Sequence, residues 1–79
     1  MSDMIQHADR YKQVGLNISF YRRRMGLTQM ELAEKANISR QFLSQIEAPN
    51  MVISLSLEKL FDLADVFGVE PSRLLEYRK

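Results

Sequence analysis

Arg40, Gln41, Ser44 and Gln45 are hydrogen-bonding residues whose spacing would place them on one side of a helix. Residues three and four apart share a helical face, so these four would form one polar surface. A guanidinium can donate two hydrogen bonds to O6 and N7 of guanine, and a glutamine amide can pair with the edge of adenine. The four residues are therefore candidates for contact with base edges. The alternative is an ordinary solvated surface.

The helix that would carry this polar surface is predicted to begin after Ser39. The Ser39 hydroxyl is a suitable N-cap, because it can accept a hydrogen bond from a backbone N–H of the first turn. Leu43 and Ile46 form the opposite, apolar flank. Pro49 limits the helix, because the residue before a proline avoids the helical conformation.

A shorter helix is predicted immediately before it. Thr28 and Glu31 have the spacing of a capping box, which marks a helix N-terminus. Asn37 ends the helix, because asparagine tolerates the left-handed conformation that a sharp turn requires. Ala33 is small where the two helices would cross closely. The pair spans about residues 29 to 48 and predicts a helix-turn-helix, whose second helix suits the major groove of DNA.

The first predicted helix runs up to Gly26. Asp9 is a candidate N-cap, and apolar residues then recur at spacings of three and four from Tyr11 to Met25, which is typical of one buried helical face. Gly26 is a suitable C-terminal stop. Residues 1–8 show no sustained period, and we expect them to form a flexible N-terminal arm.

Two more helices are predicted in the second half. Ser56 is placed to cap a fourth helix that ends at Gly68, and Pro71 suits the first turn of a short fifth helix. Every predicted element is helical and every connection is short. The sequence therefore predicts an all-α fold in which residues 9–79 form a single domain.

The composition excludes several classes of function. The chain has 79 residues, of which 46% are hydrophobic and 27% are charged, as in an ordinary small folded domain. It has no cysteine, its one histidine is His7, and no carboxylate pair or glycine-rich phosphate loop stands out. We therefore expect no enzymatic activity, no metal site, no cofactor and no small-molecule substrate. No apolar run approaches the ~18 residues that would cross a bilayer, and we expect a cytoplasmic protein.

Charge is unevenly divided along the chain. Residues 10–47 contain seven basic and three acidic side chains, a net charge of +4, whereas residues 48–79 contain four basic and five acidic ones, a net charge of −1. Phosphate backbones bind where cations gather. The first half is therefore the half expected to face a nucleic acid.

With caps, turn and core positions in register, the sequence resembles the helix-turn-helix family of Cro and phage repressors, also called the XRE family. The resemblance covers some 60 residues and implies a five-helix lambda-repressor-like domain, with the helix-turn-helix formed by helices 2 and 3. The motifs that carry it include Val14-Gly15, Arg22, Gly26-Leu27-Thr28-Gln29, Glu31-Leu32-Ala33, Ile38-Ser39, Leu43-Ser44-Gln45-Ile46-Glu47, Ser56-Leu57-Glu58 and Leu74-Leu75.

The resemblance also implies roles for individual residues. Gln29 would hydrogen-bond a DNA phosphate together with nearby backbone N–H groups. Ser39 would divide its hydroxyl between the helix cap and a phosphate. Arg22 and Glu47 would form an internal ion pair that joins the first helix to the end of the third. The four polar residues of the third helix, Arg40, Gln41, Ser44 and Gln45, would lie near base edges.

A family member of this kind would bind double-stranded DNA at specific sequences and act as a small transcriptional regulator, with repression favoured over activation. A homodimer on a palindromic operator is expected, because one such module reads only a few base pairs. The alternative function is that of an antitoxin or accessory protein that uses the same helices to bind another protein.

The loop after Glu47 departs from the family pattern. The family usually has a glycine and then basic residues here, whereas residues 48–55 of this chain carry no charge. Fewer cationic contacts predict a shallower dependence of DNA affinity on salt. The apolar run Met51-Val52-Ile53 is a candidate dimer interface, and packing on the chain's own core is the alternative.

Leu16 and Phe20 form a second departure, because they are apolar where the family is generally polar. Either Met4 and Ile5 of the N-terminal arm cover them, or they form an exposed contact patch.

Overall fold

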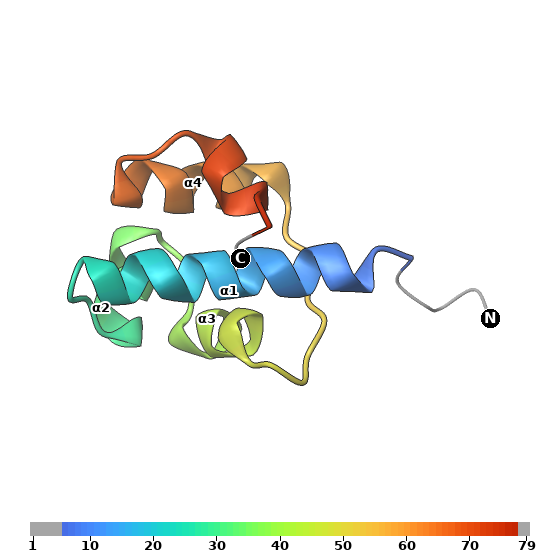
Figure 1. Cartoon of the computed structure of the whole chain (residues 1–79). Coiled ribbons are helices and arrows are strands. Elements are labelled where there is room, and N and C mark those ends of the chain that lie inside the picture. The colour runs from blue at the N-terminus through green and yellow to red at the C-terminus, as the bar shows by residue number, and fades with distance from the viewer. Residues whose placement is uncertain (1–5, 78–79) are drawn as a thin grey trace.

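Four α-helices and one short 3-10 helix make up the described part of the chain, residues 6–77, in the computed structural model (Figure 1). They are α1 (Ala8–Arg24), α2 (Gln29–Lys35), α3 (Arg40–Glu47), α4 (Leu57–Phe67) and the 3-10 helix η1 (Pro71–Leu75). The predicted all-α class is confirmed for this part of the chain.

Helix α1 runs through the middle of the molecule, with α2 and α3 on one side and α4 and η1 on the other (Figure 1). Each element contributes buried apolar side chains to one core. Its members are Val14, Ile18, Leu32, Ala33, Ala36, Leu43, Ile46, Leu60, Leu63, Ala64 and Leu74. This core fixes how α2 and α3 lie relative to each other and to α1.

Both the start of α2 and the turn between α2 and α3 form as the sequence predicts. Thr28 accepts a hydrogen bond from the Glu31 backbone N–H, and the Glu31 side chain accepts one from the Thr28 N–H, completing the capping box. Asn37 has a φ of 58°, in the left-handed region. The backbone N–H of Ile38 then donates to the carbonyl of Ala33 at 3.0 Å, which closes the turn.

At Gly15, α1 lies very close to the backbone of α3. A Cβ atom built on Gly15 would overlap the backbone carbonyl oxygen of Ile46. Because that oxygen belongs to backbone, it cannot move aside as a flexible side chain could. Only glycine therefore allows α1 to lie against the end of α3 at this distance.

The start of α1 differs from the prediction. The helix begins at Ala8, and His7 occupies the N-cap position without a side-chain capping bond, so the assignment of Asp9 as N-cap is wrong. Asp9 lies in the first turn, where its negative charge still favours the helix dipole. Residues 1–5 of the expected N-terminal arm lie outside the described residues, and so do Met4 and Ile5 as possible covers for the patch on α1.

The predicted fifth helix is a 3-10 helix rather than an α-helix, so the described part has four α-helices and not five. Pro71 begins it as expected. Its end is set by Asn17, a fully buried residue of α1 whose Nδ2 atom donates to the carbonyl oxygens of Leu74 at 3.0 Å and of Glu76 at 2.6 Å. These carbonyls bond to a side chain instead of to a further helical turn, and Glu76 is extended.

The loop between α3 and α4 packs partly on the core. Ile53 and Leu55 lie against it, whereas Met51 is exposed. Of the apolar run Met51-Val52-Ile53, Ile53 thus packs on the chain's own core, as the alternative prediction states. The side chain of Met51 stays exposed. Among residues 6–77, no helix is both long enough and apolar enough to pass through a bilayer.

Candidate nucleic-acid interface

The exposed flank of α3 carries the residues that the sequence predicts for base contact. Arg40 and Gln41 are exposed, whereas Ser44 and Gln45, one turn later, are half-buried. The opposite flank is held by Leu43 and Ile46, which are buried in the core. The four polar residues therefore lie on one side of a helix that is fixed to the rest of the domain.

Phe42 lies between the polar flank and the core. Its side chain is half-buried and packs against the core cluster. This contact makes Phe42 part of the packing of the domain and leaves the polar flank of α3 to Arg40, Gln41, Ser44 and Gln45.

Ser39 caps α3. Its Oγ atom accepts a hydrogen bond from the Phe42 backbone N–H at 3.0 Å. Because Ser39 is exposed, its hydroxyl hydrogen can still point outward and donate. The local sequence thus fixes both where α3 begins and where the Ser39 hydroxyl lies.

Arg22 and Glu47 join α1 to the last residue of α3 through a bidentate ion pair. Arg22 Nε lies 2.8 Å from Glu47 Oε2, and Arg22 Nη2 lies 2.9 Å from Glu47 Oε1. Arg22 Nη1 also donates to the carbonyl oxygen of Leu27 at 2.8 Å. Only 12% of the Arg22 side chain and 5% of the Glu47 side chain are exposed. Water therefore screens this pair much less than it screens a surface pair.

Gln29, at the first position of α2, extends the same network. Its Nε2 atom donates to Glu47 Oε1 at 3.2 Å. The Glu47 carboxylate of α3 thus binds one side chain from α1 and one from α2. This contact orients the Gln29 amide at the N-terminus of α2, where the sequence predicts a phosphate.

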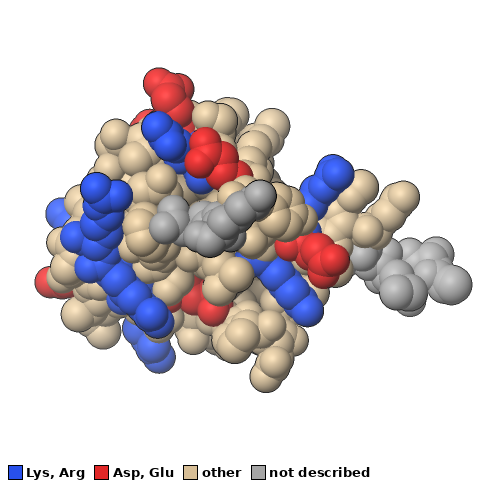
Figure 2. Space-filling view, in the orientation of Figure 1, with Lys and Arg blue, Asp and Glu red and all other residues tan. Residues whose placement is uncertain are grey.

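Cations gather around this network. Figure 2 shows Lys and Arg side chains over the end of the molecule where α1 ends. Arg23 and Arg24, in the last turn of α1, are exposed, and so is Arg40 at the start of α3. The structure therefore brings Arg23, Arg24 and Arg40 to the region of the end of α1 and the start of α3.

Two long-range contacts, one in this site and one between α1 and η1, were not predicted from the sequence. The bond between Gln29 and Glu47 joins residues 18 positions apart, and no local pattern signals it. The buried Asn17 has a visible signal, because it falls among buried positions of α1 such as Val14 and Ile18. A polar residue on an apolar face needs hydrogen-bond partners, which here are supplied by the end of the chain.

No group of three or more His, Cys, Asp or Glu side chains that could hold a metal ion occurs within residues 6–77.

Comparison with known proteins gives related results at three levels. A family model described as helix-turn-helix matches residues 18–74. An immunity repressor protein of Bacillus phage phi105 is 40% identical over 62 residues, which are 78% of this chain and 42% of that repressor. A chain in the solved SinR protein/SinI protein complex is 35% identical and superposes with a TM-score of 0.73, over 80% of this chain and 60% of that one. The chain thus spans less than two thirds of either relative.

The family match covers more than half of the chain and includes α2, the turn, α3 and α4. The sequence motifs, the observed helix-turn-helix and the similarity to a phage repressor agree with one another. This chain belongs to the helix-turn-helix family of Cro and phage repressors, the XRE family.

Proposed function

We propose that this chain binds double-stranded DNA at specific sequences and acts as a transcriptional repressor. The observation that carries the proposal is the flank of α3 on which Arg40 and Gln41 are exposed while Leu43 and Ile46 hold the helix on the core. A rigid helix with an outward polar flank suits direct reading of base edges in the major groove. The similarity to a phage immunity repressor supports repression over activation. A cytoplasmic location follows from such a role.

In this proposal the residues have separate tasks. Arg40, Gln41, Ser44 and Gln45 contact base edges, and Gln29 and Ser39 contact phosphates beside them. Phosphate contacts fix the position of the protein on the duplex, and base contacts supply the sequence preference. Arg22 and Glu47 support both tasks by holding α1, α2 and α3 together.

Selection of bound duplexes from a random DNA pool tests the proposal. The selected duplex is then titrated in a gel-shift assay against random duplex of the same length at fixed salt. We expect binding of the selected duplex to be tighter by a factor of about 10³ or more, as for specific DNA-binding proteins. Equal affinity for selected and random duplexes would contradict sequence-specific binding.

We infer a homodimer on a palindromic operator, because two modules are needed to read a site of useful length. The exposed Met51, in the loop after α3, is available for such an interface, whereas Ile53 packs inward. Analytical ultracentrifugation with and without the selected duplex tests this inference. Monomers alone under both conditions would rule it out.

A second candidate function is that of a protein-binding module such as an antitoxin or accessory factor. It is favoured by the relative whose solved structure is a complex of the SinR and SinI proteins. The gel-shift titration separates the two functions, because a module that uses its helices only to bind protein would show no preference among DNA sequences.

A further inference from the structure

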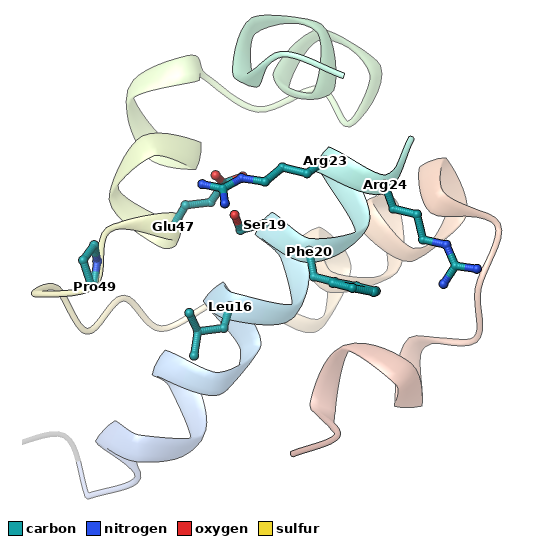
Figure 3. Close-up of a pocket in the computed structure, with 7 residues that line it drawn as sticks. All are labelled: Leu16, Ser19, Phe20, Arg23, Arg24, Glu47 and Pro49. Atoms are coloured by element: carbon teal, nitrogen blue, oxygen red, sulfur yellow. The ribbon is translucent and has the colours of Figure 1, made fainter. Parts of the chain in front are cut away.

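A groove of about 600 Å³ lies between α1 and the end of α3 (Figure 3). Leu16, Phe20 and Pro49 give it an apolar lining, and Leu16 is 55% exposed. Arg23 and Arg24 also line the groove and leave α1 in different directions, Arg23 toward Glu47 and Arg24 beyond Phe20. The groove therefore combines apolar contact area with positive charge.

Among the described residues, no acidic side chain that lines this groove is available to neutralise the charges of Arg23 and Arg24. The Glu47 carboxylate lines the groove, but it is already paired with Arg22. The Cζ atom of Arg24 lies 6.0 Å from the centroid of the Phe20 ring, so its charge stays beside the apolar lining. A well-matched occupant would carry apolar side chains next to carboxylates.

The outer face of α4 has this chemistry. Leu57 is 66% exposed and Phe61 is 44% exposed, and they lie one turn apart. Three carboxylates lie on the same side of the helix: those of Glu58 and Asp65 are exposed, and that of Asp62 is half-buried. The outer face of α4 thus has an apolar edge beside an acidic edge. The opposite side of α4 packs on the core.

The two surfaces also match in spacing. Leu16, Phe20 and Arg24 follow one another at intervals of four residues along α1. On α4, Leu57, Phe61 and Asp65 follow at the same intervals. Side chains four apart form the ridges that interdigitate when helices pack. Aligned in parallel, the two ridges bring leucine to leucine, phenylalanine to phenylalanine and arginine to aspartate.

We propose that the groove on α1 receives α4 of a second copy of this chain, through the ridges Leu16-Phe20-Arg24 and Leu57-Phe61-Asp65. The two surfaces differ, so the contact is heterologous: each pair keeps one groove and one α4 face available for further copies. Copies therefore associate head to tail, and copies bound at neighbouring DNA sites bind cooperatively. The contact does not depend on the proposed DNA binding, and it is separate from the symmetric dimer.

Cysteine cross-linking tests the contact, because the natural chain has no cysteine. The Leu16→Cys and Leu57→Cys variants are mixed without DNA under mild oxidation, and disulfide-linked dimers are identified by mass. We expect the mixed dimer, which joins residue 16 of one copy to residue 57 of another, to form about tenfold faster than either dimer of identical variants. A faster dimer of two Leu57→Cys chains would instead indicate a symmetric contact through α4 and would overturn the proposal.

A matched control uses Met30→Cys in place of Leu16→Cys. Met30 is 59% exposed, close to the value for Leu16, but it lies on α2 and outside the groove. Its mixed dimer with the Leu57→Cys chain should form no faster than random collision allows. Equal rates for the Met30→Cys and Leu16→Cys chains would contradict a specific contact.

Charge exchange tests the polar end of the ridges. Arg24→Asp in the Leu16→Cys chain should slow the mixed cross-link about fivefold, because like charges then meet where an exposed ion pair would form. Asp65→Arg in the Leu57→Cys chain should restore the rate. Both residues are exposed, so the folds should persist, and circular dichroism checks this. Failure of the second change to restore the rate would contradict the alignment.

The chain's own N-terminal residues are the competing occupant. If the mixed cross-link appeared only after Met4→Ser and Ile5→Ser were introduced, the groove would belong to those residues, and the proposal would be wrong.

Discussion

Arg40 and Gln41 differ from Gln29 in how their side chains are held. Within residues 6–77, no hydrogen bond to another side chain fixes either Arg40 or Gln41, whereas Gln29 donates to Glu47. A side chain that is already ordered loses less conformational entropy on binding. The residue proposed for phosphate contact is thus preorganised, and those proposed for base contact become ordered on the duplex.

Replacing Arg40 or Gln41 with alanine should weaken specific binding by about 1–3 kcal/mol each and relax the preference at the base pair contacted. Their exposure means that the folded state should hardly change. Titrations with the selected duplex and with versions altered at single base pairs measure both effects. Two variants that keep the full preference of the natural chain would show that these residues do not read bases.

Arg22→Ala should lower the free energy of unfolding by about 3–5 kcal/mol, because it leaves the buried Glu47 carboxylate without its partner. Replacing both residues, as Arg22→Met with Glu47→Leu, should recover much of this loss. Urea unfolding measures the three stabilities.

Arg73→Ala is the control for that comparison, because Arg73 and Glu76 form an exposed pair at 3.7 Å. Its removal should change the stability by at most about 1 kcal/mol. Similar losses for Arg22→Ala and Arg73→Ala would mean that burial of the first pair has no energetic consequence.

At the level of elements, α1 sets the position of α3. The two helices are joined by the ion pair at their ends and by the close approach at Gly15. The same helix binds η1 through Asn17. Since α1 contacts α3 on one side and η1 and α4 on the other, it connects the two layers.

Gly15→Ala should destabilise the fold by about 3 kcal/mol, at the upper end of the range for overpacking, because the new methyl group meets backbone and the helices must separate. Thermal unfolding measures the loss. Gly26→Ala is the matched control: its φ is +74°, but nothing lies within 4 Å of the added carbon, so only about 1 kcal/mol of backbone strain is expected. A Gly15→Ala protein as stable as the Gly26→Ala protein would contradict the close contact.

At the level of the whole molecule, a group of basic residues lies around the end of α1 and the start of α3, whereas the loop after α3 carries no charge. DNA affinity should therefore depend on fewer cationic contacts than in relatives with a basic loop. Each phosphate neutralised contributes about 0.9 to the slope of log affinity against log salt.

Asn50→Lys should steepen that slope by about 0.9, because it adds a cation to the exposed start of this loop. Ser72→Lys adds the same charge to η1, in the layer on the other side of α1, and should leave the slope unchanged. Gel-shift titrations at several salt concentrations measure both slopes. Equal steepening by the two variants would mean that net charge alone, and not the position of the loop, controls binding.

The sequence by itself determined the local parts of this protein. Caps at Thr28, Ser39 and Ser56, and the left-handed turn at Asn37, depend on atoms within a few residues of one another. Local hydrogen bonds and backbone preferences can therefore be predicted from the sequence. Together with the spacing of the apolar residues, they predicted the four α-helices. The polar flank of α3 followed from the same periodicity, whereas its contacts with DNA remain predictions.

The tertiary structure alone decided the contacts between distant residues. The bond from Gln29 to Glu47 and the approach of Gly15 to Ile46 exist only once the core has fixed the angles between helices. The bonds from the Asn17 amide to carbonyls nearly sixty residues away likewise fix the end of η1 against α1. Such contacts depend on how many side chains from all helices pack together in the core. A pattern within a short stretch of sequence does not determine that packing.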